Sequence, residues 1–183
     1  MTVTSLVFFA SACLAALVYH RLPARLRLPW LLVISLAFVL TWSWQFALVL
    51  VFYSGINYWL GLRASPANPA RKRWVTAGII INILFLFIFK YNHFFLPQFS
   101  ALLSSLGVLR EGSLLQLLMP VGLSFLMVQN ISYLVDVSNN RLTPETSFIR
   151  FSVYILYFPK LLSGPVERAR VFLPRLVSPL VVD

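Results

Sequence analysis

The sequence predicts an all-α fold, a polytopic membrane helix bundle with about four or five membrane segments and one re-entrant or interfacial segment. Of its 183 residues, 60% are hydrophobic and only 11% are charged. A soluble domain of this length cannot bury so much apolar surface. The basic residues, which set the net charge of +10, lie mainly in short gaps between the apolar runs. That pattern is typical of cytoplasmic loops facing anionic lipid, so we expect the bilayer and not nucleic acid as the partner.

The first apolar run covers residues 3–19 and has no positively charged leader. It therefore predicts a retained helix with its N-terminus outside, because a cleaved signal peptide begins with basic residues. The next run, 29–62, is too long for one helix of about 20 residues. We place a tight hairpin at 42–45, whose two tryptophans favour the membrane interface. The hairpin divides the run into helices over 30–41 and 46–62.

A basic loop broken by prolines follows at 63–73, and 74–89 is a clear membrane span. Residues 94–113 are mixed and predict a short helix lying at the interface. The run 114–137 is long enough to cross a bilayer, with Pro120 kinking or delaying its start. We expect Thr143 to cap a further helix that begins at Pro144.

The run 114–137 is unusual because it carries polar residues that lipid cannot satisfy. Gln129, Ser132, Tyr133 and Asp136 fall at helical offsets of three, four and seven, so they form one polar stripe. With Asn130, these residues are candidates for lining a tunnel or for hydrogen bonds between helices. For Asp136 the alternative is a water-exposed helix end; we expect a partner inside the protein, either Arg141 or the 148–170 segment.

The last region, 148–165, contains Arg150, Pro159 and Lys160 and makes a poor span. A re-entrant or surface-lying segment fits better, because irregular backbone survives at membrane depth only inside protein or a wet cavity. Five residues are expected to shape the backbone and not to do chemistry: Pro120, Gly122, Pro159, Gly164 and Pro165. If this segment does not cross, we expect the basic loops 20–28 and 63–73 and the turn 139–140 to lie inside, and the 42–45 hairpin to lie outside. No separate soluble domain is expected.

No catalytic or metal-binding motif is present in the sequence. His20 and His93 lie at predicted span edges, and the lone Cys13 has no partner for a disulfide or a metal site. Arg168 and Arg170 are candidates for contact with an anionic acyl donor, although lipid phosphate is the commoner partner. We therefore assign no catalytic residue and no metal ligand.

Several short strings resemble the membrane-bound O-acyltransferase family, and most closely its bacterial alginate O-acetyltransferase branch. They are residues 120–125 (PVGLSF), 129–136 (QNISYLVD), 158–165 (FPKLLSGP) and the pair Arg168 and Arg170, with 57–63 (NYWLGLR) and 89–92 (FKYN) upstream. They occur in the family's order along nearly the whole chain. The sequence departs from the pattern of this branch at residues 126–128 and 138–141. These differences weaken the assignment of the acceptor more than that of the family.

The resemblance implies transfer of an acyl group from a thioester, acetyl-CoA or a carrier-bound acyl group, to a hydroxyl of an extracytoplasmic polysaccharide such as alginate. It implies a bacterial inner-membrane protein that works with periplasmic acetylation proteins. The family's essential histidine lies in a later part that this chain lacks, so we expect an N-terminal portion of one domain, inactive alone. The alternatives are a non-catalytic scaffold or partner-docking subunit and, less favoured because no inverted repeat is found, a transporter.

Overall fold

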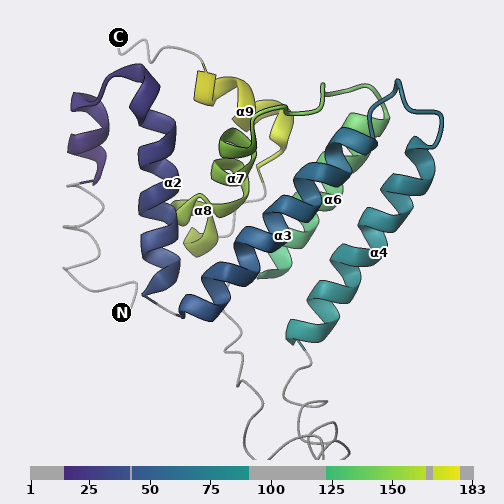
Figure 1. Ribbon diagram of the computed structural model, residues 1–183, viewed down its shortest axis with the longest axis horizontal. Helices are drawn as coiled ribbons and strands as arrows, with labels where there is room; N and C mark the ends of the chain where they lie inside the picture. The colour runs from purple at the N-terminus through teal and green to yellow at the C-terminus, as the bar shows by residue number, and fades with distance from the viewer. Residues whose placement is uncertain (1–14, 42, 91–122, 164–166, 178–183) are drawn as a thin grey trace, which may run out of the picture.

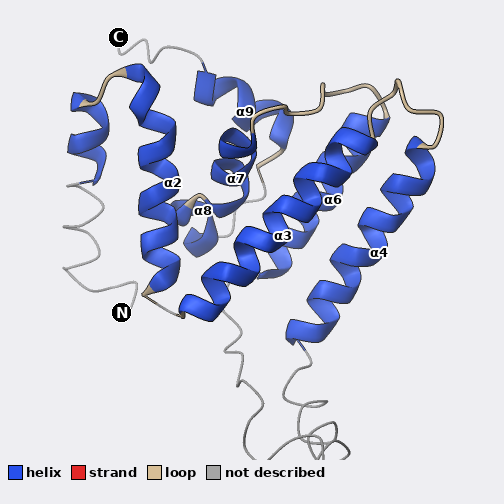
Figure 2. Ribbon diagram, viewed as in Figure 1, coloured by secondary structure: helices blue, strands red, loops and turns tan. Residues whose placement is uncertain are grey.

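The computed structural model describes residues 15–41, 43–90, 123–163 and 167–177. Within these ranges the chain forms helices and loops and no strand, so the all-α prediction is confirmed for the described part (Figure 2). Four helices are long, and they are α2 (Ala24–Leu40), α3 (Trp44–Arg63), α4 (Arg71–Lys90) and α6 (Leu123–Ser138). The short helices are α7 (Phe148–Leu156), α8 (Phe158–Ser163) and α9 (Ala169–Val177), and residues 15–21 are also helical.

Helices α3, α4 and α6 pack against one another, and α7 lies between them and α2 (Figure 1). The close approach of α3 and α4 to α6 depends on two glycines. A Cβ at Gly61 of α3 would lie 2.5 Å from the ring of Tyr133, and one at Gly78 of α4 would overlap the side chain of Leu134. Because both α6 side chains are fully buried, neither can move aside cheaply.

The predicted hairpin is confirmed by the end of α2 at Leu40 and the start of α3 at Trp44. Ser43 caps α3, since its Oγ accepts a hydrogen bond from the main-chain nitrogen of Phe46 at 3.3 Å. The prediction that α2 begins near residue 30 is wrong. The helix starts at Ala24 and carries Pro29 in its second turn, where one main-chain hydrogen bond is lost but the helix continues.

Two of the described helices, α3 and α4, are long and apolar enough to cross a membrane. They agree with the predicted spans 46–62 and 74–89. The prediction of four or five membrane segments is not confirmed by the described helices. Most of the first run, the interfacial segment 94–113 and the start of the run at 114 lie outside them.

The prediction of a helix that begins at Pro144 is also wrong. Residues 142–147 are non-helical, and α7 begins at Phe148 with Ser147 as its cap, whose Oγ accepts from the nitrogen of Arg150 at 3.4 Å. The cause is tertiary. The main-chain nitrogen of Glu145 donates to the hydroxyl of Tyr133 on α6 at 3.0 Å, so this stretch is held against α6 instead of coiling.

The segment 148–162 is two helices and not one, because α7 ends at Leu156 and α8 starts at Phe158. The ring of Pro159 would clash with the carbonyl of Ile155 in a continuous helix. The nitrogen of Phe158 instead donates to Ser35 Oγ of α2 at 3.3 Å. This bond anchors α8 on α2 at the break.

Figure 1 also shows which loops share an end of the bundle. The turn before α2, the loop 64–70, the loop 139–147 and α9 lie at one end. The turn between α2 and α3 lies at the opposite end, with the last residues of α4. We call the first of these the basic end, because it carries Arg25, Arg63, Arg71–Arg73 and Arg170.

Candidate functional site

The polar residues of α6 face the protein. Gln129, Asn130, Tyr133 and Asp136 are each at most 3% exposed, and Ser132 is partly buried. Since an α-helix places residues three and four apart on one face, α6 turns a single polar stripe towards α7 and the 142–146 loop. The described residues therefore surround the stripe with protein and not with lipid.

Gln129 and Tyr154 join α6 to α7 through two hydrogen bonds. Gln129 Nε2 donates to the main-chain oxygen of Tyr154 at 2.7 Å, and the Tyr154 hydroxyl donates to the main-chain oxygen of Gln129 at 3.3 Å. Both residues are buried, so water does not compete for these bonds. These two hydrogen bonds fix the position of α7 along the axis of α6. They thereby fix the position of the loop that precedes α7.

A second polar cluster, which sequence reasoning missed, joins α3 to α4. The Tyr53 hydroxyl donates to Asn82 Oδ1, and Asn82 Nδ2 donates to Asn57 Oδ1 at 2.7 Å and to the oxygen of Gly78 at 2.8 Å. Asn57 Nδ2 donates to the oxygen of Tyr53 at 3.0 Å. We call Tyr53, Asn57 and Asn82 the amide cluster. Its sequence signal was an asparagine in the middle of each apolar run.

Asp136 is the acidic residue of the stripe, and its Oδ2 is buried without a hydrogen-bond donor among the described residues. The nitrogen of Arg141 donates to the main-chain oxygen of Asp136 at 2.9 Å, but no ion pair joins the two side chains. Ser152 Oγ of α7 and Asn130 Oδ1 are buried and unpaired in the same way. The α6 and α7 region thus holds polar atoms that the described residues leave unsatisfied.

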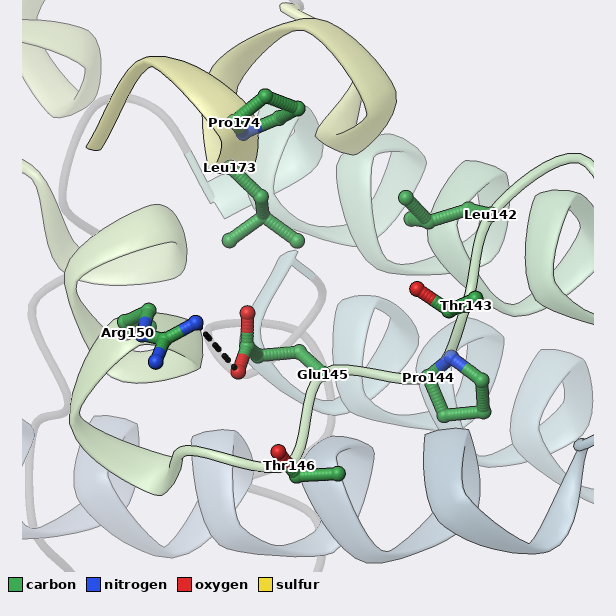
Figure 3. Close-up of a pocket in the computed structure, with 8 residues that line it drawn as sticks. All are labelled: Leu142, Thr143, Pro144, Glu145, Thr146, Arg150, Leu173 and Pro174. Atoms are coloured by element: carbon green, nitrogen blue, oxygen red, sulfur yellow. Dashed lines mark ion pairs between the residues drawn. The ribbon is translucent and has the colours of Figure 1, made fainter. Parts of the chain in front are cut away.

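An open cavity of about 250 Å³ lies at the basic end (Figure 3). It is lined by Leu142, Thr143, Pro144, Glu145, Thr146, Arg150, Leu173 and Pro174. Glu145 Oε1 accepts from the nitrogen of Ser147 at 2.8 Å and lies 3.6 Å from Arg150 Nη1. The Tyr58 hydroxyl donates to the oxygen of Thr146 at 2.6 Å. The cavity therefore combines a fixed ion pair with apolar walls from α9.

Lys160 of α8 is a buried cation with aromatic neighbours. Its Nζ lies 3.2 Å from the centroid of the Phe172 ring, 5.1 Å from that of Tyr154 and 3.3 Å from Glu167 Oε2. The contact with Glu167 is an ion pair without the directed geometry of a hydrogen bond. Burial lowers the pKa of the Lys160 ammonium to about 8, and Glu167 opposes part of that shift.

The remaining predicted site residues are spread out. Arg168 and Arg170 are exposed where α9 begins, and neither forms an ion pair in the described part of the chain. Pro159 lies in the first turn of α8, directly after the break between α7 and α8. Four residues lie outside the described ranges: Pro120, Gly122, Gly164 and Pro165.

The described residues contain no group of acidic, histidine or cysteine side chains able to hold a metal ion. His20 is exposed, with its ring edge-on to Tyr19 at 5.7 Å, and His93 and Cys13 lie outside the described residues. We assign no general base to the described residues.

Comparison with known proteins identifies the class. The chain is 32% identical over 155 residues to the probable alginate O-acetylase AlgI of Azotobacter vinelandii and 31% identical over 153 residues to that of Pseudomonas aeruginosa. It is 30% identical over 203 residues to a peptidoglycan O-acetyltransferase of Helicobacter pylori. These alignments cover 83%, 82% and 94% of the chain. No family model and no solved structure matches it.

The predicted resemblance is therefore confirmed, and the chain belongs to the membrane-bound O-acyltransferase family. The alignments cover 31%, 29% and 38% of the three relatives, so the chain spans about a third of the length of the proteins it matches.

Proposed function

We propose that this chain is part of a bacterial inner-membrane enzyme that transfers an acetyl group to hydroxyls of an extracytoplasmic polysaccharide. The observation that carries the proposal is the similarity to relatives whose names join O-acetyl transfer to alginate and to peptidoglycan. Both acceptors are carbohydrate polymers, so the shared chemistry is ester formation at a sugar hydroxyl. Alginate is our first choice of acceptor, because five of the six relatives found carry that name.

The reaction needs an acetyl thioester, from acetyl-CoA or a carrier, and a base that removes the hydroxyl proton. The hydroxyl oxygen then forms the ester bond to the acetyl carbon as the carbon–sulfur bond breaks and the thiol leaves. We propose that the donor arrives at the basic end, where Arg168 and Arg170 meet its phosphates. Periplasmic acetylation proteins are the proposed partners on the other side.

The proposed topology is multi-pass, with the N-terminus and the 41–44 turn outside and the basic end inside. It is supported by the common end of the basic loops (Figure 1) and by the positive-inside rule. In a Cys13→Ser background, an impermeant maleimide added outside should label a cysteine at Ser43 and miss one at Ala70. Cysteines at Ser147 and Arg175 should report the same side, because α7 and α8 are too short to cross. The reverse pattern at Ser43 and Ala70 contradicts this topology.

The activity is tested in inner-membrane vesicles that contain the complete enzyme of which this chain is proposed to form part, given radiolabelled acetyl-CoA and either alginate or peptidoglycan as acceptor; the chain alone is expected to be inactive. We expect alkali-labile label on the polysaccharide. Arg168→Gln with Arg170→Gln should raise the KM for acetyl-CoA, whereas Arg175→Gln is the matched control, since Arg175 pairs with Glu167 at 3.0 Å. Label no higher than in vesicles without the chain, despite correct maleimide topology, contradicts the enzymatic proposal and favours a scaffold.

A further inference from the structure

The junction of α3 and α4 lies at the basic end (Figure 1), and its sequence carries two tryptophans, Trp59 and Trp74, and four cations, Arg63 and 71–73. The Cζ of Arg63 lies 5.3 Å from the Trp59 ring centroid and 5.8 Å from that of Trp74, and the two indole rings meet edge to face at 5.0 Å. Arg63 itself is exposed. The Arg63 guanidinium forms no ion pair with the described residues, so its N–H groups are able to bind an oxygen anion.

The loop between the helices is held by hydrogen bonds. Asn68 Nδ2 donates to the oxygen of Arg63 at 2.8 Å, and Asn68 Oδ1 accepts from the nitrogen of Ala70 at 3.0 Å. The nitrogen of Arg71 donates to the oxygen of Asn68 at 3.1 Å. Asn68 thus connects the last residue of α3 to the first turn of α4, which fixes the end of α3 relative to the start of α4.

The first turn of α4 is Arg71, Lys72 and Arg73, without an acidic residue. Cations there oppose the helix dipole, which places partial positive charge at the N-terminus, so this turn is unfavourable for the isolated helix. No ion pair among the described residues involves any cation of 63–73. A bound anion offsets both the dipole and the mutual repulsion, whereas folding alone gives no reason for this arrangement.

We infer that Trp59, Arg63, Trp74 and the first turn of α4 form a binding site for the headgroup of an anionic phospholipid. The occupant follows from the surroundings. Both helices are the candidate membrane spans, and large apolar side chains next to the site on α3 are exposed, Ile56 at 43% and Leu62 at 36%. A lipid places its phosphate at the tryptophans and its acyl chains on these side chains. The inference rests on the membrane placement proposed above.

The test uses the full chain with Trp30, Trp42 and Trp44 replaced by Phe, so that fluorescence comes from Trp59 and Trp74. It is reconstituted with brominated phosphatidylglycerol or brominated phosphatidylcholine, each of which quenches indole at short range. We expect phosphatidylglycerol to bind at least about threefold more strongly, from several cations near its charge. Arg63→Gln with Arg73→Gln should remove the preference, and the charge-matched control Arg21→Gln with Arg25→Gln should keep it.

Four results overturn the inference. Equal quenching by the two lipids means that no headgroup is selected, and an equal loss in both double variants means general surface attraction. Loss of the preference on adding free coenzyme A assigns the cluster to nucleotide phosphates. Absence of quenching by either lipid contradicts the membrane placement, and the site with it.

A second measurement separates binding from folding by the sign of the effect. In neutral detergent, Arg71→Gln with Lys72→Gln and Arg73→Gln should leave the melting temperature equal or higher, because it removes cations from a helix N-terminus. Added phosphatidylglycerol should raise the melting temperature of the parent but not of the variant. A variant that is less stable in neutral detergent contradicts the inference.

Discussion

The amide cluster of α3 and α4 and the polar region of α6 to α8 are buried to a similar degree, but their hydrogen bonding differs. Every side-chain polar atom of Tyr53, Asn57 and Asn82 is bonded within the cluster or to nearby main chain. In the other region Asp136 Oδ2 and Ser152 Oγ are buried without a hydrogen bond to the described residues, and Lys160 Nζ has an ion pair with Glu167 as its polar contact there.

The difference indicates two kinds of buried polarity. A cluster whose polar atoms are all hydrogen-bonded fixes how two helices pack, because hydrogen bonds are directional and apolar contacts are not. Such a cluster leaves no polar atom for a ligand. Unsatisfied buried atoms cost free energy, so they persist where a group from elsewhere completes them or where chemistry needs them. The amide cluster is therefore structural, and the α6 to α8 region is where we look for function.

The largest effect is expected from Asn82→Leu. It removes the partner of both the Tyr53 hydroxyl and Asn57 Oδ1, so the free energy of unfolding should fall by about 3 kcal/mol. The measurement is unfolding of the detergent-solubilised chain by sodium dodecyl sulfate, followed by circular dichroism. Ile83→Leu, at a side chain that is 51% exposed, is the control. A change as small as that of the control contradicts the structural role of the cluster.

A smaller loss, about 1–2 kcal/mol, is expected from Gln129→Leu, because one buried oxygen, that of Tyr154, loses its donor. The same unfolding assay applies. Val128→Leu, at the exposed neighbouring position, should change the unfolding free energy little. If Gln129→Leu is neutral, the contact between α6 and α7 depends on apolar packing alone.

Asp136→Asn tests the region whose buried polar atoms lack hydrogen bonds, and here we expect little change in stability. The substitution keeps the shape and removes a carboxylate whose Oδ2 has no donor among the described residues, so stability should change by less than about 1 kcal/mol. Acetyl transfer in vesicles is measured alongside, and we expect it to fall. A stability loss as large as that of Asn82→Leu would mean that a donor outside the described residues pairs with Asp136.

The smallest effect concerns pH and Lys160. Its pKa is about 8 in the fold and 10.5 unperturbed, so the unfolded chain binds more protons between these values. Stability should therefore rise as pH increases from 8 to 10.5, by less than about 1 kcal/mol because the Glu167 partner is partly wet. Lys160→Met should lack this rise. A parent that loses stability over this range relative to Lys160→Met contradicts burial of the ammonium.

Much of the helical layout was predictable from local signals. The two tryptophans at 42 and 44 indicated the hairpin, because tryptophan favours the membrane interface, and the structure adds that Ser43 caps α3. The spans ending at Arg63 and Lys90 followed from length and composition. The prediction was wrong where a contact distant in sequence sets the local structure. Thr143 and Pro144 are typical of a helix start, but the hydrogen bond from Glu145 to Tyr133 holds this stretch in a non-helical conformation.

The sequence by itself determined the family, the helical class and the polar stripe of α6, because these depend on residue order and on the helical period. Only the tertiary structure decided which polar atoms are satisfied. Asn57 and Asn82 are far apart in the chain, and their bond exists because α3 and α4 pack side by side. The same packing brings Arg63, the last residue of α3, near the rings of both Trp59 and Trp74, and Trp74 belongs to a helix that begins with three cations. Whether a polar atom is hydrogen-bonded, and whether charged and aromatic side chains cluster, depends on which residues are neighbours in space. The periodic pattern of a single helix does not contain that information.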